Sequence, residues 1–352
     1  MFTRPSPRAL LVTGVVLLLV AGAAVTAWRL WPRPTEFESA VSMLPKQTQR
    51  VIWTDWAGVR EELGAGDVSG TDSAAEEFLA EATDRELATS SLASSALLLA
   101  DGFGFSPLAA EWEVFGQSAE GQVVVVRTEQ DLGTVRDRVR DLGYTGPGKD
   151  ELDGGVWSGG PDAVAKVTGL TAYQLQTMAL FEDEGLIVGS DNREELEKTI
   201  KIIREGEGGV DTGELLEAAG EPLTATALLQ DRACAELSLT QAAPDAQTTA
   251  RALVEQAGGV SPLTGYVVAL LPGDDLRVVF GFEDEERAGR NARSRAALAR
   301  AEDPAQYVAY PEVFDLADSE ADGSLVILTG KVRADAFPMS SLATGPVLLA
   351  TC

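Results

Sequence analysis

Residues 122–128 read QVVVVRT, and this stretch decides the fold class. Four consecutive valines place β-branched side chains on both faces of an extended strand, which predicts a central strand buried on both sides. Trp112–Phe115 precedes it across Gly116-Gln117, so the two segments predict a hairpin. Asp131–Leu142 follows with apolar residues at helical spacing. The stretch therefore lies in an α+β arrangement with antiparallel strands.

The same order of elements recurs in the second half of the chain. Strand, helix, hairpin, helix and hairpin follow one another between Arg50 and Gly189, and the order repeats between Leu223 and Thr329. We therefore predict an α+β fold with two units of antiparallel sheet that are covered by helices and arose by duplication. A cleft between such units is the default place for a ligand.

The N-terminal stretch Ala9–Ala27 reads ALLVTGVVLLLVAGAAVTA and carries no charge. As a helix it would measure about 28 Å, close to the thickness of the hydrocarbon core of a bilayer. Arg4 and Arg8 precede it, so we expect a single-pass transmembrane signal-anchor with the C-terminal body outside the cytoplasm. The alternative is a signal peptide that is cleaved near Ala27 and leaves a secreted protein.

The predicted domain boundaries follow from these segments. They place the cytoplasmic tip and signal-anchor at 1–31, a linker at 32–49, the first α+β unit at 50–205 and the second unit at 206–352.

The charge of the chain restricts its partners. Lysine and arginine total 28 against 55 acidic residues, a formal net charge of −27. Nucleic-acid binding requires basic side chains that neutralise phosphates, so no nucleic acid is expected as a partner. The expected partners are the membrane, through Ala9–Ala27, and an envelope protein or glycan of unknown identity.

The two cysteines, Cys234 and Cys352, predict a disulfide. Neither has a CxxC neighbour, and the chain has no histidine to complete a common zinc site. Two thiols exported to an oxidising compartment tend to pair. The alternative is two unpaired thiols.

No catalytic motif is present. Without histidine there is no histidine-based triad, and GxSxG, SxxK and P-loop patterns are absent from the sequence. We therefore expect no enzyme and no cofactor. Asp318–Gly323 imitates part of a calcium loop, but its third position is Glu320 and no helix is expected to follow, so we predict a solvated hairpin turn and no metal site.

Among the tryptophans, Trp157 is predicted to be the exposed one. It lies in the glycine-rich loop Asp153–Gly160, and an exposed indole there would contact a ligand such as a sugar or peptide. The favoured interpretation for the tryptophans as a group is ordinary packing in the core.

Three features resemble a known group of proteins: Met43-Leu44-Pro45, the strand Arg50–Trp56, and the loop Gly154-Gly155-Val156-Trp157-Ser158-Gly159. With arginine far in excess of lysine, the chain resembles uncharacterised membrane-anchored or exported envelope proteins of high-GC Gram-positive bacteria. The resemblance implies an envelope location and brings no activity or site residues.

The sequence thus favours a membrane-anchored, extracytoplasmic binding or scaffold protein of the cell envelope without catalysis. One alternative is a carboxylate-dependent cell-wall hydrolase, which would need clustered carboxylates with raised pKa values. The other is a binder of a small apolar ligand between the two units, which would need a deep apolar pocket. A scaffold would instead expose apolar surface.

Overall fold

The computed structural model describes residues 34–66, 68–148 and 151–352. Glu36–Cys352 forms one compact body. The predicted membrane segment Ala9–Ala27 lies outside the described residues. Within the described ranges, no helix combines the length and the apolar character needed to cross a bilayer.

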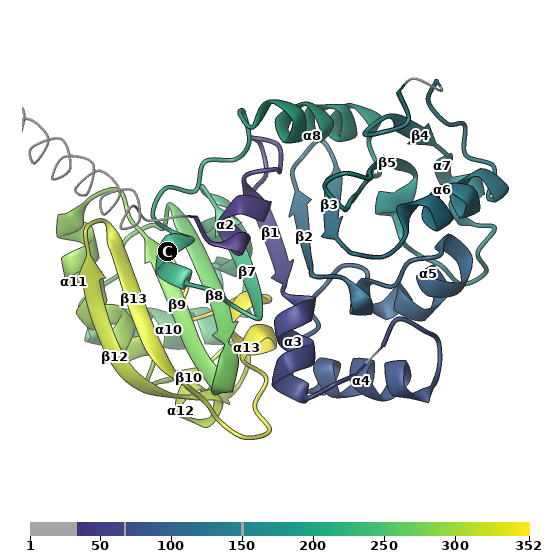
Figure 1. Cartoon of the computed structure of the whole chain (residues 1–352). Helices are drawn as coiled ribbons and strands as arrows, with labels where there is room; N and C mark the ends of the chain where they lie inside the picture. Colours follow the sequence, from purple (N-terminus) through teal and green to yellow (C-terminus); the bar gives the residue numbers. More distant parts are fainter. Residues whose placement is uncertain (1–33, 67, 149–150) are drawn as a thin grey trace, which may run out of the picture. The chain divides into compact units, whose positions relative to one another are not determined.

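The body is built on one large antiparallel sheet (Figure 1). Within the described residues the sheet has 11 strands in the order β12-β13-β9-β8-β7-β1-β2-β3-β6-β5-β4. Their bounds are β1 Arg50–Thr54, β2 Trp112–Gln117, β3 Gln122–Arg127, β4 Val156–Ser158, β5 Thr177–Phe181, β6 Leu186–Ser190, β7 Thr224–Leu229, β8 Gly265–Leu271, β9 Asp275–Gly281, β12 Phe314–Asp322 and β13 Leu325–Val332. A separate ribbon pairs β10, Glu302–Asp303, with β11, Val308–Ala309.

The first five strands follow the same order when the sheet is followed outward from its middle in either direction, and β4 extends one side. One side runs β1-β2-β3-β6-β5 and the other runs β7-β8-β9-β13-β12. At the centre β1 and β7 pair antiparallel, with Ile52 opposite Thr226. The two predicted units therefore share one continuous sheet, because their first strands are hydrogen-bonded to each other.

The valine strand β3 is buried as its sequence predicts. Val124 and Val126 pack in the apolar cluster on one face of the sheet, and Val123 and Val125 pack in the cluster on the other face. All four side chains are at most 2% exposed. Both faces of the sheet must therefore be covered at this strand.

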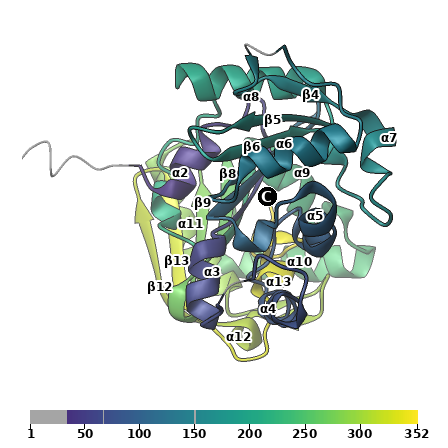
Figure 2. The ribbon, with the colours of Figure 1, turned by 45° about the vertical axis from the view of Figure 1, so that its right-hand side comes forward.

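Helices provide that cover (Figures 1 and 2). In Figure 2, β5 and β6 lie between α8 and α6. The helices that contribute to the larger cluster are α3 Trp56–Leu63, α4 Ser73–Asp84, α5 Ala96–Phe103, α6 Leu132–Asp141, α7 Gly160–Val164, α9 Arg232–Leu237, α10 Pro244–Ala257, α11 Glu285–Leu298, α12 Tyr310–Val313 and α13 Pro338–Ala343. The helices on the opposite face are α2 Glu36–Val41 and α8 Arg193–Glu205.

Two local structures depend on contacts between distant parts of the chain. Helix α4 ends at Asp84. Soon after it, Glu86 has a φ of 54°, and its carboxylate accepts from the Met339 and Ser340 amides at the start of α13. Residues 347–350 form a buried segment of turns near the C-terminus. In both places a contact between distant parts of the chain overrides the local pattern.

A carboxyl group lies buried at the centre of the sheet. Glu113 on β2 is opposite Thr54 and is 1% exposed. It accepts hydrogen bonds from the Ser91 amide at 3.0 Å and the Ser91 hydroxyl at 2.9 Å, and it also bonds to the Ser90 hydroxyl. No basic side chain is among these partners, so burial raises the pKa of the Glu113 carboxyl.

This raised pKa predicts that wild type loses stability relative to Glu113→Gln as pH rises. Below the pKa of the unfolded state, Glu113 is protonated in both states and its contribution is intact. As pH rises through the folded pKa, the buried carboxyl group must ionise. Each unit by which the pKa of the folded state exceeds that of the unfolded state costs about 1.4 kcal/mol of stability. Denaturant unfolding from about pH 4 to 9 measures this. Exposed Glu81→Gln is the control, and parallel profiles for wild type and Glu113→Gln would contradict the prediction.

Candidate functional site

The candidate site is a surface pocket beside α10. This helix begins with Pro244 and ends before Gly258, whose φ of 99° favours glycine. Within α10 only Ala246 and Ala250 are buried, and the helix packs on α11. Because so few of its residues are buried, much of the surface of α10 is available for further contacts.

The pocket lies between α10 and the β10–β11 ribbon. Its volume is about 400 Å³, within the usual range of ligand sites. Most of the surface that lines it is apolar. We call it the Tyr307 pocket, and its lining residues are Asp245, Ala246, Thr249, Leu253, Ala301, Glu302, Pro304 and Tyr307.

Tyr307 presents its ring to solvent at this pocket. The residue is 75% exposed and its φ is 58°, a left-handed conformation that is uncommon for an aromatic residue. Its amide donates to the Asp303 carbonyl at 2.8 Å, which holds the turn. The positive φ and the exposed aromatic ring together make Tyr307 a candidate for a role outside the core.

Asp303 is fully buried, and its side chain holds this turn by hydrogen bonds. Its Oδ1 accepts from the amides of Ala305 at 2.8 Å and Gln306 at 3.3 Å. Its Oδ2 accepts from the Tyr310 hydroxyl at 2.7 Å and from the Leu348 amide at 2.6 Å. The four donors satisfy the carboxylate and make the ribbon rigid.

The C-terminal segment 347–351 is the other half of this support. Arg295 is fully buried and donates to the carbonyls of Leu349 at 2.7 Å and Thr351 at 2.8 Å. Burial lowers the pKa of its guanidinium to about 9, so the charge persists at neutral pH. Hydrogen bonds thus hold this segment at both kinds of backbone group: Arg295 donates to its carbonyls, and Asp303 accepts from the Leu348 amide.

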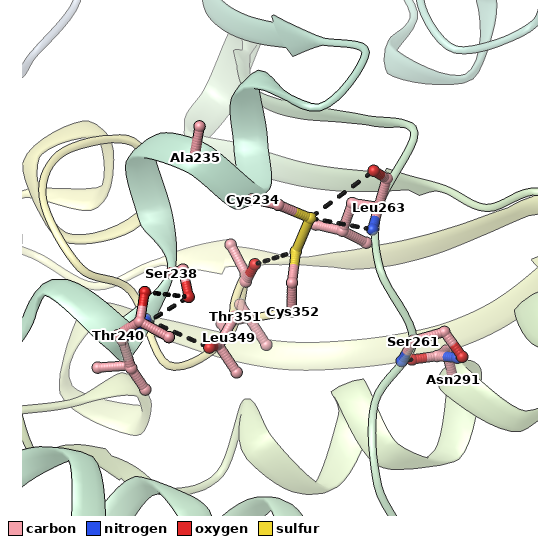
Figure 3. Close-up of a disulfide and its surroundings, with 12 residues drawn as sticks. Cys234, Ala235, Ser238, Thr240, Ser261, Leu263, Asn291, Leu349, Thr351 and Cys352 are labelled. Carbon is pink, nitrogen blue, oxygen red and sulfur yellow. Dashed lines mark hydrogen bonds between the residues drawn. A yellow bond between two sulfur atoms is a disulfide. The ribbon is translucent and has the colours of Figure 1, made fainter.

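The structure pairs Cys234 with Cys352, as the sequence predicts (Figure 3). The Cα atoms are 5.5 Å apart and the cysteines are separated by 118 positions. The bond ties the last residue of the chain to α9. A second pocket of about 170 Å³ lies beside it, on the other side of α10, with Arg251 in its wall.

Because the Tyr307 ring is exposed, it adds little to stability, and the fold tolerates its loss. We expect Tyr307→Gly to leave the free energy of unfolding unchanged or to raise it by up to about 1 kcal/mol, since glycine adopts positive φ freely. Denaturant unfolding measures this. The comparison is Tyr310→Phe, which removes a buried hydroxyl and should destabilise by about 1–3 kcal/mol. A large destabilisation by Tyr307→Gly would show that the ring has a structural role.

The prediction that Trp157 is the exposed tryptophan is wrong. Its side chain is 1% exposed on β4, and the Arg140 guanidinium lies 5.4 Å from its ring centroid. The predicted ligand contact at Trp157 required an exposed ring, and this ring is buried. Short-range glycine content indicated a loop, but β4 pairs with β5 and draws the indole into the core.

The segment Asp318–Gly323 is not the predicted turn. β12 continues to Asp322, and the chain reverses only at Gly323-Ser324. Among the described residues, no group of three or more acidic or cysteine side chains is placed to hold a metal ion. Asp318 and Glu320 are exposed on the outermost strand, where charges discourage edge-to-edge pairing.

An acidic pocket of about 550 Å³ lies where β3 leads into α6. Seven of its lining residues are carboxylates: Glu36, Glu111, Glu129, Asp131, Glu182, Asp183 and Glu184. Asp131 caps α6, and its bonds to the Thr134 hydroxyl and the Gly133 amide lower its pKa. Burial raises the pKa of Asp55 and Glu113, but neither residue lines this pocket.

Sequence reasoning missed Tyr307. The only local signal is Asp303-Pro304, a turn dipeptide followed by an aromatic residue among polar ones. The positive φ and the neighbouring α10 cannot be read from that pattern. The pocket is formed only when residues 245–253 meet residues 301–307.

No family model and no curated protein matches the chain. Among solved structures, crystal form I of TP0453 is similar with a TM-score of 0.37 and 6% identity, covering 84% of this chain and 93% of that one. Crystal form III gives 0.36 and 7% over 84% and 94%. At these scores the similarity carries no conclusion about the function of this chain.

Proposed function

We propose that the chain is a membrane-anchored, extracytoplasmic protein of the cell envelope that binds another envelope component and catalyses no reaction. Ala9–Ala27 is the anchor in this proposal. The disulfide between Cys234 and Cys352 supports a location outside the cytoplasm, because disulfides persist in oxidising compartments. The resemblance to exported envelope proteins agrees with that location.

One observation carries the binding role: Tyr307 is held at positive φ with its ring exposed over an apolar pocket. Exposed aromatic residues beside apolar hollows are typical anchors of binding surfaces. The buried support at Asp303 and Arg295 keeps the turn that carries the ring in place before a partner arrives. Such preorganisation lowers the entropy cost of association.

The alternatives find less support. A cell-wall hydrolase needs a carboxyl group with a raised pKa in an open cleft, and the buried Glu113 is surrounded by hydroxyl partners in the core. A small apolar ligand between the two halves would need space at their junction, where β1 and β7 are hydrogen-bonded. The Tyr307 pocket lies wholly within the second half.

We also infer that the two halves arose by duplication. The support is the matching strand order on the two sides of the β1–β7 pair. The binding site then belongs to one half only, since the β10–β11 ribbon follows α11 in the second half.

Partner recovery from cells tests the binding role. Full-length wild type, Tyr307→Ala and Tyr173→Ala are expressed, crosslinked in the cell and purified. Tyr173, 62% exposed in the first half, is the matched control. We expect a reproducible envelope partner with wild type and Tyr173→Ala, and its loss with Tyr307→Ala. Equal recovery from all three would contradict the proposed site.

The anchor is tested separately. We expect the mature protein to have the intact mass of the full chain and to remain in the membrane fraction after a high-salt wash. A mass that corresponds to cleavage after Ala27 would support the secreted alternative.

A further inference from the structure

We propose that the Tyr307 pocket recognises a protein segment in which an apolar side chain is flanked by lysine or arginine. The inference rests on the proposed function and names the partner chemistry for the same site. It is carried by the combination of an apolar floor, an exposed aromatic ring and acidic residues at one pocket.

The charged side chains that line the pocket are of one sign. Asp245 and Glu302 line it and are exposed, and no lysine or arginine is among the described residues that line it. The basic residues nearest to the lining along the chain, Arg251 and Arg300, do not line this pocket. Arg251 lines the pocket beside the disulfide, and the Arg300 guanidinium donates to the Ala296 carbonyl at 2.7 Å.

The remaining lining defines the rest of the ligand. Leu253, Ala246 and Pro304 provide apolar contacts, and a volume of about 400 Å³ suits side chains rather than a folded element. The exposed Tyr307 ring can contact a cation through its π face. A segment with an apolar residue next to a cation satisfies all of these groups together.

A protein segment is favoured over a membrane surface by the charge of the whole molecule. The formal net charge of −27 repels anionic lipid headgroups and attracts basic polypeptides. The same field steers association, so the on-rate should fall as salt increases.

Calorimetry with three peptides tests this class of ligand. The full-length protein in a neutral detergent is titrated with acetylated, amidated Lys-Trp-Lys, Gln-Trp-Gln and Glu-Trp-Glu. We expect the order Lys-Trp-Lys, then Gln-Trp-Gln, then Glu-Trp-Glu, with the preference reduced by salt. Asp245→Asn/Glu302→Gln should weaken Lys-Trp-Lys binding on the order of fivefold and leave Gln-Trp-Gln unchanged.

The matched control is Asp318→Asn/Glu320→Gln, which removes the same charge from the edge strand β12. An equal effect of the two double variants would overturn the inference, because attraction would then be a property of the whole surface. Equal binding of all three peptides, lost in Tyr307→Ala, would also overturn it but leave the proposed binding site intact. No peptide binding, together with unchanged partner recovery in Tyr307→Ala, would count against both.

A vesicle-binding experiment tests whether the pocket binds a membrane surface instead of a protein segment. Vesicles of phosphatidylcholine with phosphatidylglycerol are offered to wild type and Tyr307→Ala, and we expect no difference between them. Vesicle binding that depends on Tyr307, without peptide binding, would replace the protein segment by a membrane as the ligand.

Discussion

Removal of the disulfide is expected to lower the free energy of unfolding by about 5 kcal/mol in the chain-entropy model. The reason is the length of the loop, since Cys234 and Cys352 are separated by 118 positions. Without the bond, the unfolded chain gains freedom that the folded chain does not. Guanidinium unfolding of Cys234→Ser/Cys352→Ser against wild type measures the difference.

The folded tail should nevertheless stay in place when the bond is lost. Val347–Ala350 is fully buried, and its backbone is bonded to Arg295, Tyr310 and Asp303. Hydrogen exchange at these amides should therefore remain slow in the reduced protein under native conditions. A stability loss below about 1 kcal/mol, or rapid exchange of the tail, would show that the disulfide acts differently.

Replacement of Asp303 by asparagine is expected to destabilise the body by about 3–5 kcal/mol. Four donors point at this carboxylate, from Ala305, Gln306, Tyr310 and Leu348. An amide can accept at its oxygen only, so its NH2 group would face donors and leave them unpaired. The matched control is Asp318→Asn on the exposed strand β12, which should change stability by less than about 0.5 kcal/mol.

The same substitution should also affect binding, because Asp303 holds the turn that exposes Tyr307. We expect Asp303→Asn to recover less partner than wild type even at temperatures where it stays folded. Unfolding curves and partner recovery on the same preparations measure both effects. The claim that Asp303 supports the binding site would be contradicted by an Asp303→Asn variant that is as stable as wild type. It would also be contradicted by a destabilised variant that recovers as much partner as wild type.

Much of the fold could be predicted from local sequence. The valines of β3 predicted a buried strand correctly because the local pattern and the environment agree. The order of elements also predicted two matching halves. It did not predict that β1 and β7 pair, because nothing in Arg50–Thr54 distinguishes an edge strand from a central one.

The candidate site was hidden for a related reason. Its proposed binding feature is the backbone conformation of one residue, Tyr307, and its support comes from Arg295 and the C-terminal segment 347–351. These groups are distant in sequence, and a buried arginine bonded to carbonyls has no local signature. The disulfide could be predicted because only one pair of cysteines exists and because the expected export would favour its formation.

Site-specific photo-crosslinking tests the binding role most directly. A photoreactive phenylalanine analogue replaces Tyr307 in the full-length protein in cells, and Tyr173 carries the same group in a control strain. We predict one discrete adduct with an envelope protein from position 307, absent from position 173 and weakened by Asp245→Asn/Glu302→Gln. Adducts of equal yield and pattern from both positions, or none from position 307, would contradict a binding site at the Tyr307 pocket.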